Sequence, residues 1–294
     1  MKTQSKPDVY EIVTDRIIAL LEAGTVPWRK PWKSQTGIPR NFVSRKAYRG
    51  INTLLLHCMN YESPYWLTYK QAEAKGGNVR KGEKACPVVF WKKLEIEDSQ
   101  TQAKKEIAMI RYYHVFNVAQ CEGLELPETP AATITDTTPI EAAHKIVDNW
   151  QGKPTIEGGH IKAYYLPGRD FIGMPEPESF VSMAHYYQTL FHELTHSTGH
   201  VSRLNRESIT GQVNFGSQVY SKEELLAEMG AAFLSGHAGI SESQIENSAA
   251  YIASWLEALK NDRKLVVCAA AAAQKAVDYI LGTRFEAVKM EEAE

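Results

Sequence analysis

The stretch Thr189–His200, TLFHELTHSTGH, decides how the second half of this 294-residue chain is interpreted. It contains the pattern HExxH, with His192 and His196 four residues apart. On a helix this spacing puts both imidazoles on one face, one turn apart, where they can bind the same metal ion. Glu193 lies about 100° further round the helix, where a carboxylate can act as general base on a water molecule. The stretch therefore predicts a helix that carries a mononuclear metal site of the zincin type.

The surroundings of this string favour a metal site over two surface histidines on an ordinary helix. Helical periodicity begins near Ser182, and Gly199 is placed to end the helix. His200 follows His196 by four residues, whereas the third histidine of metzincins follows at about six. We expect His200 at the rim of the site and the third ligand further along the chain.

The third ligand is expected from residues 221–233, SKEELLAEMGAAF, which include Glu223, Glu224 and Glu228. Ser221 and Glu224 have the spacing of a capping box, which gives Glu224 a structural role. Glu228 lies one turn further on among apolar residues, where a carboxylate needs a strong partner such as a cation. The sequence therefore predicts Glu228 as the third ligand. In a thermolysin-like arrangement the first acid would bind the metal and the second would orient a histidine, which leaves Glu224 as the alternative.

Two imidazoles and one carboxylate with an open fourth position suit Zn²⁺ best, and Mn²⁺ is the alternative ion. Glu193 is the candidate catalytic base of such a site, which would make the chain a peptide hydrolase of unknown substrate.

The charge of the chain is distributed unevenly. Residues 1–93 carry 17 Lys or Arg and 7 Asp or Glu, a balance of +10. The remainder carries 16 and 28, a balance of −12. A basic half joined to an acidic half indicates two different functions.

Aromatic residues are interleaved with the cations of the basic half. The segment Pro27–Trp32, PWRKPW, contains two prolines that hold the backbone extended, which favours displayed rings. Exposed rings can stack on unpaired bases while cations track the phosphates. The pattern predicts single-stranded DNA as a partner, bound by Trp28, Arg29, Lys30, Trp32, Lys33, Arg45 and Arg49. The alternative is that the rings form a domain core and the charges lie on its solvated surface.

Composition also indicates how the chain is divided. Residues 126–140, LPETPAATITDTTPI, have the composition of a linker. We expect an α+β fold, with a small N-terminal α+β single-stranded-DNA-binding domain at 1–126, a linker at 127–138, and a mainly helical domain with a small sheet at 139–294. No run of apolar residues is long enough for a membrane span, and the four scattered cysteines form no CxxC pair. These features predict a cytoplasmic protein without a membrane segment.

Local signals place several elements. Helical periodicity is expected over 7–23, 182–198, 222–235, 242–261 and 265–281. Thr138, Pro139 and Glu141 form a capping signal that starts a helix near 139. Strands are expected at CPVVFW (86–91), at MIRYYHVF (109–116) and within 161–174.

Over nearly its whole length the chain resembles plasmid antirestriction proteins of the ArdC type. The motifs that carry the resemblance are PWRKPW (27–32), YRGIN (48–52), WLTYKQ (66–71), VFNVAQCEGL (115–124) and FHELTHSTGHVSRLNR (191–206). The N-terminal domain of that family is similar to the single-stranded-DNA-binding part of TraC-type conjugative primases, and its C-terminal domain resembles zincin metallopeptidases. In this resemblance His192, Glu193 and His196 match the metal site, and Glu228 matches the acidic position before GAAF.

The resemblance implies single-stranded DNA binding, a metal centre and protection of incoming plasmid DNA from host restriction during conjugation. A protein substrate among the host restriction components is the corresponding expectation for a peptidase. Two other functions stay open, namely a DNA-binding protein whose metal is only structural and a cytosolic metallopeptidase that does not act on DNA.

Overall fold

The protein is described by a computed structural model that covers residues 8–32, 37–97, 104–125, 137–211, 218–241 and 248–283; for 92–97, 104–108 and 218–220 it describes the backbone alone. The predicted linker lies mostly outside these residues, as do Lys33 and the start of the helix expected from 242. The α+β fold class is confirmed, because helices and small separate sheets occur together.

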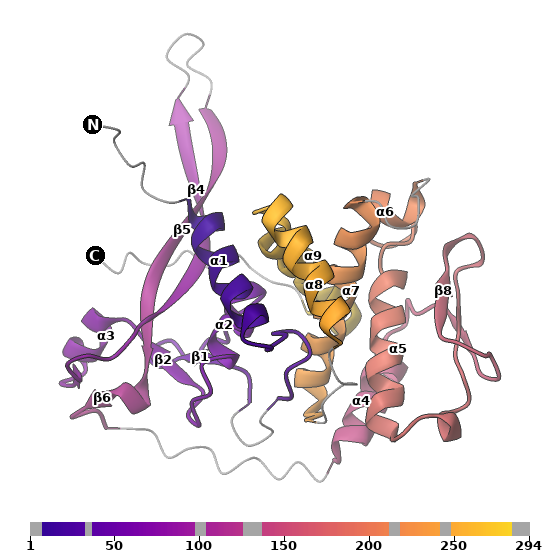
Figure 1. The fold of residues 1–294 in the computed structure, drawn as a ribbon, viewed down its shortest axis with the longest axis horizontal. Helices are drawn as coiled ribbons and strands as arrows, with labels where there is room; N and C mark the ends of the chain where they lie inside the picture. Colours follow the sequence, from indigo (N-terminus) through magenta and orange to yellow (C-terminus); the bar gives the residue numbers. More distant parts are fainter. Residues whose placement is uncertain are drawn as a thin grey trace.

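The N-terminal half contains a four-stranded sheet with the order β1-β2-β5-β4. Its strands β4 and β5 form a long antiparallel ribbon that projects from the body of the molecule (Figure 1). A second, two-stranded sheet pairs β3 with β6. The elements are α1 (Val9–Glu22), β1 (Arg40–Asn41), α2 (Ile51–His57), β2 (Tyr65–Leu67), α3 (Tyr69–Ala74), β3 (Asn78–Val79), β4 (Cys86–Glu97), β5 (Lys104–Asn117), a 3-10 turn (Val118–Gln120) and β6 (Cys121–Glu122).

The C-terminal half is mainly helical. A three-stranded sheet of order β7-β9-β8 lies beside α5 at the far end of the molecule from the ribbon (Figure 1). The elements are α4 (Pro139–Asn149), β7 (Thr155–Glu157), β8 (Tyr164–Leu166), β9 (Phe171–Gly173), α5 (Met183–Ser197), α6 (Glu207–Thr210), α7 (Gln218–Ala238), α8 (Ala249–Asn261) and α9 (Leu265–Leu281), with 3-10 turns at Pro167–Arg169 and Pro177–Ser179.

The caps explain why these helices begin where they do. Thr138 Oγ1 accepts a hydrogen bond from the Glu141 amide at 3.2 Å, and Glu141 Oε2 accepts one from the Thr138 amide at 2.7 Å, so the predicted capping box starts α4. Ser182 caps α5 by accepting from the His185 amide at 3.3 Å. The capping box predicted at Ser221 differs from the structure, because α7 already begins at Gln218 and Ser221 lies inside it.

One hydrophobic cluster extends through both halves of the chain. Helix α1 packs against α8 and α9, and its buried residues Val13, Ile17 and Leu21 belong to the same cluster as the core of α7 and α9. Helix α1 therefore covers part of α8 and α9, and Trp32 of the N-terminal half packs against Gly236 of α7. None of the helices in the described ranges has the length and apolar character needed to cross a membrane.

Candidate metal centre

The candidate site lies where α5 and α7 approach each other closely. A Cβ added at Gly230 of α7 would lie 2.4 Å from Cγ2 of Thr195 on α5, so glycine is needed for this approach. Thr195 is fully buried, and its hydroxyl donates to the Phe191 carbonyl oxygen at 2.7 Å. The contact fixes the helix pair from which the site side chains project.

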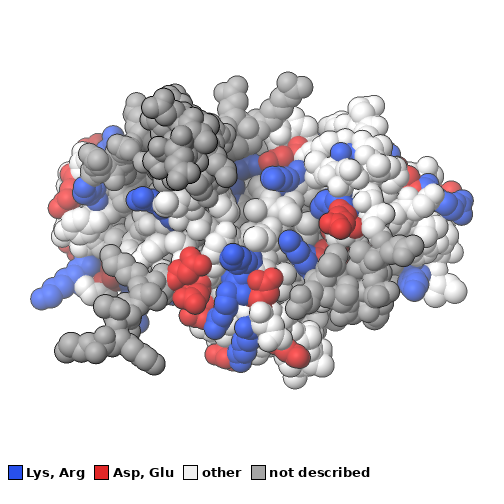
Figure 2. All heavy atoms as spheres, turned by 90° about the horizontal axis from the view of Figure 1, so that it is seen from above, with Lys and Arg blue, Asp and Glu red and all other residues white. Residues whose placement is uncertain are grey.

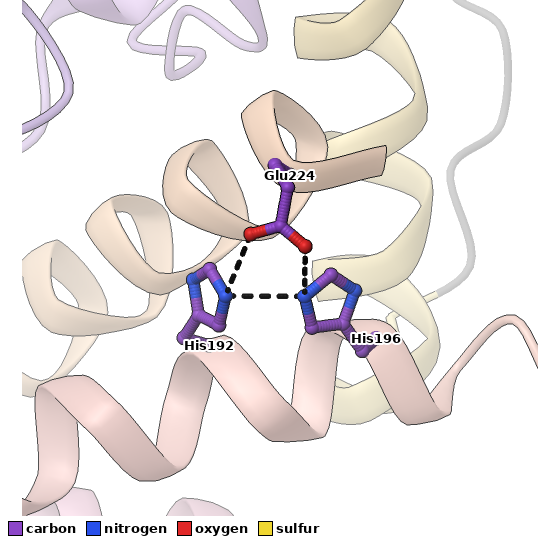
Figure 3. A group of neighbouring side chains, drawn as sticks. All are labelled: His192, His196 and Glu224. Carbon is purple, nitrogen blue, oxygen red and sulfur yellow. Dashed lines mark hydrogen bonds and ion pairs between the residues drawn. The ribbon is translucent and has the colours of Figure 1, made fainter. Parts of the chain in front are cut away.

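Three side chains converge between the two helices (Figure 3). The Nε2 atoms of His192 and His196 lie 3.1 Å apart. The Glu224 carboxylate faces both rings, with Oε2 3.6 Å from Nε2 of His192 and Oε1 3.5 Å from Nε2 of His196. The two histidines are thus brought together as the HExxH spacing predicts, and an acid from α7 completes the group.

The separations fit a single divalent cation. Ligand atoms at about 2.0–2.1 Å from a tetrahedral ion lie roughly 3.3–3.4 Å apart, close to the distances in this cluster. The surroundings are also negative. Burial alone would lower the pKa of His192, but its interaction with Glu224 and the charges of Glu193 and Glu228 outweigh burial and raise it. A cation would relieve this concentration of acidic groups.

A second carboxylate orients His196. The Nδ1 atom of His196 lies 3.2 Å from Oε1 of Glu223, and an ionised carboxylate only accepts, so Nδ1 carries the proton and donates. The other ring nitrogen, Nε2, faces His192 and Glu224. A histidine ligand held in this way by a carboxylate is a common arrangement in metal sites.

Glu223 is itself held by Arg206 of the loop after α5. Arg206 donates from Nη2 to Oε1 at 2.6 Å and from Nε to Oε2 at 3.1 Å, and the Ser208 hydroxyl donates to Oε2. Burial would raise the pKa of Glu223, but hydrogen bonds from His196 and Arg206 and the charge of Arg206 lower it to about 2. Arg206 also donates to the Thr195 and His196 carbonyls near the end of α5, at 2.9 and 3.2 Å. One guanidinium thus ties the end of the HExxH helix to α7.

Glu193, the predicted base, is a buried polar residue with 8% of its surface exposed. Its charge contributes to the raised pKa of His192, which places the carboxylate near the cluster.

Glu228, the predicted third ligand, has a different partner. Arg29 donates to its carboxylate from Nη2 at 2.6 Å, and the Tyr251 hydroxyl donates to the same oxygen at 3.1 Å. A buried carboxylate needs a cationic partner, and the partner of Glu228 is the guanidinium of Arg29 in the PWRKPW segment. The structure therefore corrects the prediction and places Glu224, the alternative, beside the two histidines.

The two tryptophans predicted to stack on bases are buried. Trp28 is 2% exposed, and its indole donates to the Tyr251 hydroxyl at 3.1 Å. Trp32 is 8% exposed, and its indole donates to the Ala232 carbonyl at 2.8 Å. The segment is not helical, but its two indole rings pack against α8 and α7 and do not lie in solvent. The structure contradicts the predicted role of both rings.

The cations predicted to bind DNA differ in their contacts and exposure. Arg29 is held by Glu228, and Arg49 forms an ion pair with Asp278 of α9. Lys30 donates to the Cys58 carbonyl at 3.4 Å. Arg45 is exposed, with its guanidinium 5.0 Å from the centre of the Phe42 ring. On the face shown in Figure 2, basic and acidic side chains are interspersed and form no broad patch of one sign.

Sequence patterns do not indicate the roles of three residues at the site, Glu223, Arg206 and Gly230. The sequence indicates Glu223 only as one of three possible ligands. Its position next to Glu224 allows Glu223 to contact Nδ1 of His196 while Glu224 faces Nε2. Arg206 lies within a quoted motif, but nothing in the pattern indicated its partner. Gly230 lies inside a predicted helix, and a glycine at such a position can indicate that another helix packs closely against it.

Comparisons with known proteins show what the chain is similar to. The family described as "N-terminal domain of anti-restriction factor ArdC" matches residues 7–116. The family described as "Zincin-like metallopeptidase" matches residues 141–272, which include α5 and α7. The HExxH helix and the acidic helix thus lie within the zincin-like match.

Curated relatives cover almost the whole chain. An uncharacterized protein of Sinorhizobium fredii, y4eC, is 37% identical over 304 residues, which is 98% of this chain and 96% of that protein. A protein named DNA primase TraC from Escherichia coli is 36% identical over 309 residues. The chain spans only 28% of that primase's length.

Two solved structures are also similar to this chain over almost its whole length. The metal-free crystal structure of antirestriction protein ArdC from plasmid R388 is 41% identical, covers 94% of this chain and has a TM-score of 0.76. The Mn(II)-bound structure of the same protein is 40% identical with a TM-score of 0.74. Because the match extends over 98% of the ArdC chain and both family descriptions fall in the expected halves, this protein belongs to the ArdC family of antirestriction proteins.

Proposed function

We propose that the chain binds one divalent metal ion through His192, His196 and Glu224. The observation that supports this assignment best is the convergence of these three ligand atoms, with Nδ1 of His196 turned to Glu223 and Nε2 turned to the cluster. Two imidazoles and one carboxylate suit Zn²⁺. The related R388 ArdC is described with Mn(II), which supports Mn²⁺ as the other candidate.

The site supports peptide hydrolysis. A bound cation would supply Lewis-acid chemistry that polarises a peptide carbonyl. Glu193 takes a proton from the attacking water and returns it to the leaving amine nitrogen. Glu223 and Arg206 keep the His196 ring in place during this reaction and are positioning residues. The proposed substrate class is protein, with host restriction components as the candidates.

The proposed biological role is protection of incoming plasmid DNA from restriction during conjugation, with single-stranded DNA as the second partner. The match of residues 7–116 to the ArdC N-terminal domain and the similarity to proteins named DNA primase support DNA binding by the first half. The basic charge of that half supports the same partner.

Calorimetric titration with Zn²⁺ and Mn²⁺ tests the metal assignment. Glu224→Gln is expected to weaken binding at least tenfold, because it removes a charged ligand, whereas Glu228→Gln is expected to stay within a few-fold of the original chain. The reverse order would make Glu228 the ligand.

Glu193→Gln tests the chemistry. The variant is expected to bind metal and to lose protection of a transferred plasmid in a restricting host. Full protection by this variant would show that the metal is structural.

A further inference from the structure

Trp91 differs from the other five tryptophans of the chain in its exposure. Trp28, Trp32, Trp66, Trp150 and Trp255 are all at most 8% exposed, whereas Trp91 is 51% exposed. It lies on β4 of the projecting ribbon (Figure 1). A single exposed ring is common on protein surfaces, whereas several exposed rings on one face indicate an interaction surface.

The register of the ribbon places other rings on the same face. Residues directly opposite each other in an antiparallel pair share a face, and every second residue along a strand returns to it. Trp91 pairs with Ile110, Val89 with Tyr112 and Pro87 with His114, so Trp91, Tyr112 and His114 lie on one face. Tyr112 is 40% exposed, and its ring lies 5.5 Å from that of His114. Successive positions on this face are about 6.6–6.8 Å apart.

The opposite face of the ribbon forms part of the core at its base. Cys86, Val88 and Val115 lie on that face and are fully buried. The other face also holds Val89, which pairs with Tyr112 and is 7% exposed, but the three rings of Trp91, Tyr112 and His114 on that face are exposed. We call the exposed rings Trp91, Tyr112 and His114 the ring row.

The charge of the ribbon complements an anionic polymer. Strands β4 and β5 together carry five Lys or Arg and three Asp or Glu. Lys92 and Lys93 directly follow Trp91, and the exposed Arg111 directly precedes Tyr112. Proteins that bind single-stranded nucleic acid commonly combine aromatic rings with cations, because bases stack on the rings and the cations contact the phosphates. An interface for a protein partner has fewer charged residues at its centre.

We propose that the ring row of the β4–β5 ribbon is the surface on which single-stranded DNA stacks its bases. This inference rests on the proposed DNA-binding function and assigns its location to Trp91, Tyr112 and His114 in place of the buried Trp28 and Trp32. The recognised feature is an unpaired base, so the surface discriminates single strands from duplex and has little preference for sequence.

Fluorescence anisotropy with a labelled oligothymidylate and a duplex control, at two salt concentrations, tests the inference. Trp91→Ala and Tyr112→Ala are each expected to weaken binding at least fivefold, with the salt dependence kept, because stacking releases no counterions. Trp91→Phe retains a ring and is expected to stay closer to the original affinity. Tyr279→Ala is the matched control, because Tyr279 is a similarly exposed ring, at 38%, on α9.

Tryptophan emission gives a second readout that does not depend on the alanine variants. Because Trp91 is the exposed tryptophan, the oligonucleotide is expected to quench emission in the original chain and much less in Trp91→Phe. If the original chain fails to bind single strands, the proposed function is overturned as well. If it binds and the ring-row variants bind equally well, the inference alone is overturned, and the ribbon is left as a candidate surface for a protein partner.

Discussion

Glu224 and Glu228 lie one helical turn apart on α7, but tertiary contacts give them different partners. Glu224 faces the two HExxH histidines, whereas Glu228 accepts hydrogen bonds from Arg29 and Tyr251. The difference arises because Arg29, from a segment 199 residues earlier, satisfies the charge of Glu228.

Glu223→Gln tests the support behind the metal ligands. The variant keeps the shape of the side chain but weakens the bond that fixes the tautomer of His196. Removing such support typically lowers metal affinity about 10–100-fold, and that loss is expected for Zn²⁺ measured by chelator competition. Glu207→Gln, at an exposed acid of α6, is the control and is expected to bind as the original chain does. Equal affinities for the two variants would contradict the role given to Glu223.

Asp170 provides a pH-dependent contribution to stability. Burial would raise its pKa, but hydrogen bonds from Arg203 and Tyr165 and the charge of Arg203 lower it. A carboxyl whose pKa is lower in the folded state stabilises the fold fully when the pH is above its pKa in the unfolded chain, about 3.9. This contribution is lost as the pH falls through its pKa in the folded state.

Asp170→Asn is therefore expected to lower the free energy of unfolding by about 1–2 kcal/mol at pH 7, with a smaller effect near pH 3. Urea unfolding at both pH values measures the difference. Asp15→Asn, which breaks an exposed pair with Arg263, is expected to change stability less. An effect of Asp170→Asn that is the same at both pH values would show that the charge of the carboxylate is unimportant.

At the scale of elements, the site depends on how closely α5 and α7 pack. Gly230→Ala would place a Cβ 2.4 Å from Cγ2 and 2.5 Å from Oγ1 of Thr195, which is fully buried. Overpacking of this kind typically costs about 1–3 kcal/mol. We expect that loss in urea unfolding and a parallel decrease in metal affinity, because the helices that carry the ligands must separate.

A second substitution, Thr195→Ala, tests whether the loss of stability in Gly230→Ala is caused by the steric contact with Thr195. Adding it to Gly230→Ala removes the two closest atoms and is expected to recover part of the lost stability. Gly168→Ala is the matched control, since a Cβ there meets no atom within 4 Å. If the double variant is no more stable than Gly230→Ala alone, the helix contact does not explain the loss.

At the scale of the whole molecule, the two halves share one hydrophobic cluster. Trp28 packs against Trp255 of α8 with ring centres 5.8 Å apart, and Trp32 lies against Gly236 of α7. A chain of residues 139–294 alone would expose the surfaces of α7, α8 and α9 that these residues and α1 cover. The two family matches cover residues 7–116 and 141–272 separately, whereas the hydrophobic cluster contains residues from both ranges.

We therefore expect residues 139–294, expressed alone, to be less stable than the whole chain. Their thermal midpoint should fall, and they should bind a dye that recognises exposed apolar surface. The whole chain with Trp28→Phe, which keeps a ring in the core, is the control and should bind little dye. A fragment that unfolds at the same temperature as the whole chain would show that the N-terminal cover contributes no stability.

Features that depend only on spacing along the chain could be predicted without the structure. The periodicity of HExxH put His192 and His196 on one face of α5, and the Thr138 capping box set the start of α4, because helix geometry fixes which residues three or four positions apart are neighbours. Tertiary structure alone decided that Glu224 faces the histidines, that Trp28 and Trp32 are buried and that Trp91 is exposed. These outcomes depend on how separate elements pack against each other, and contacts such as Arg29 with Glu228 join residues that are far apart in the sequence.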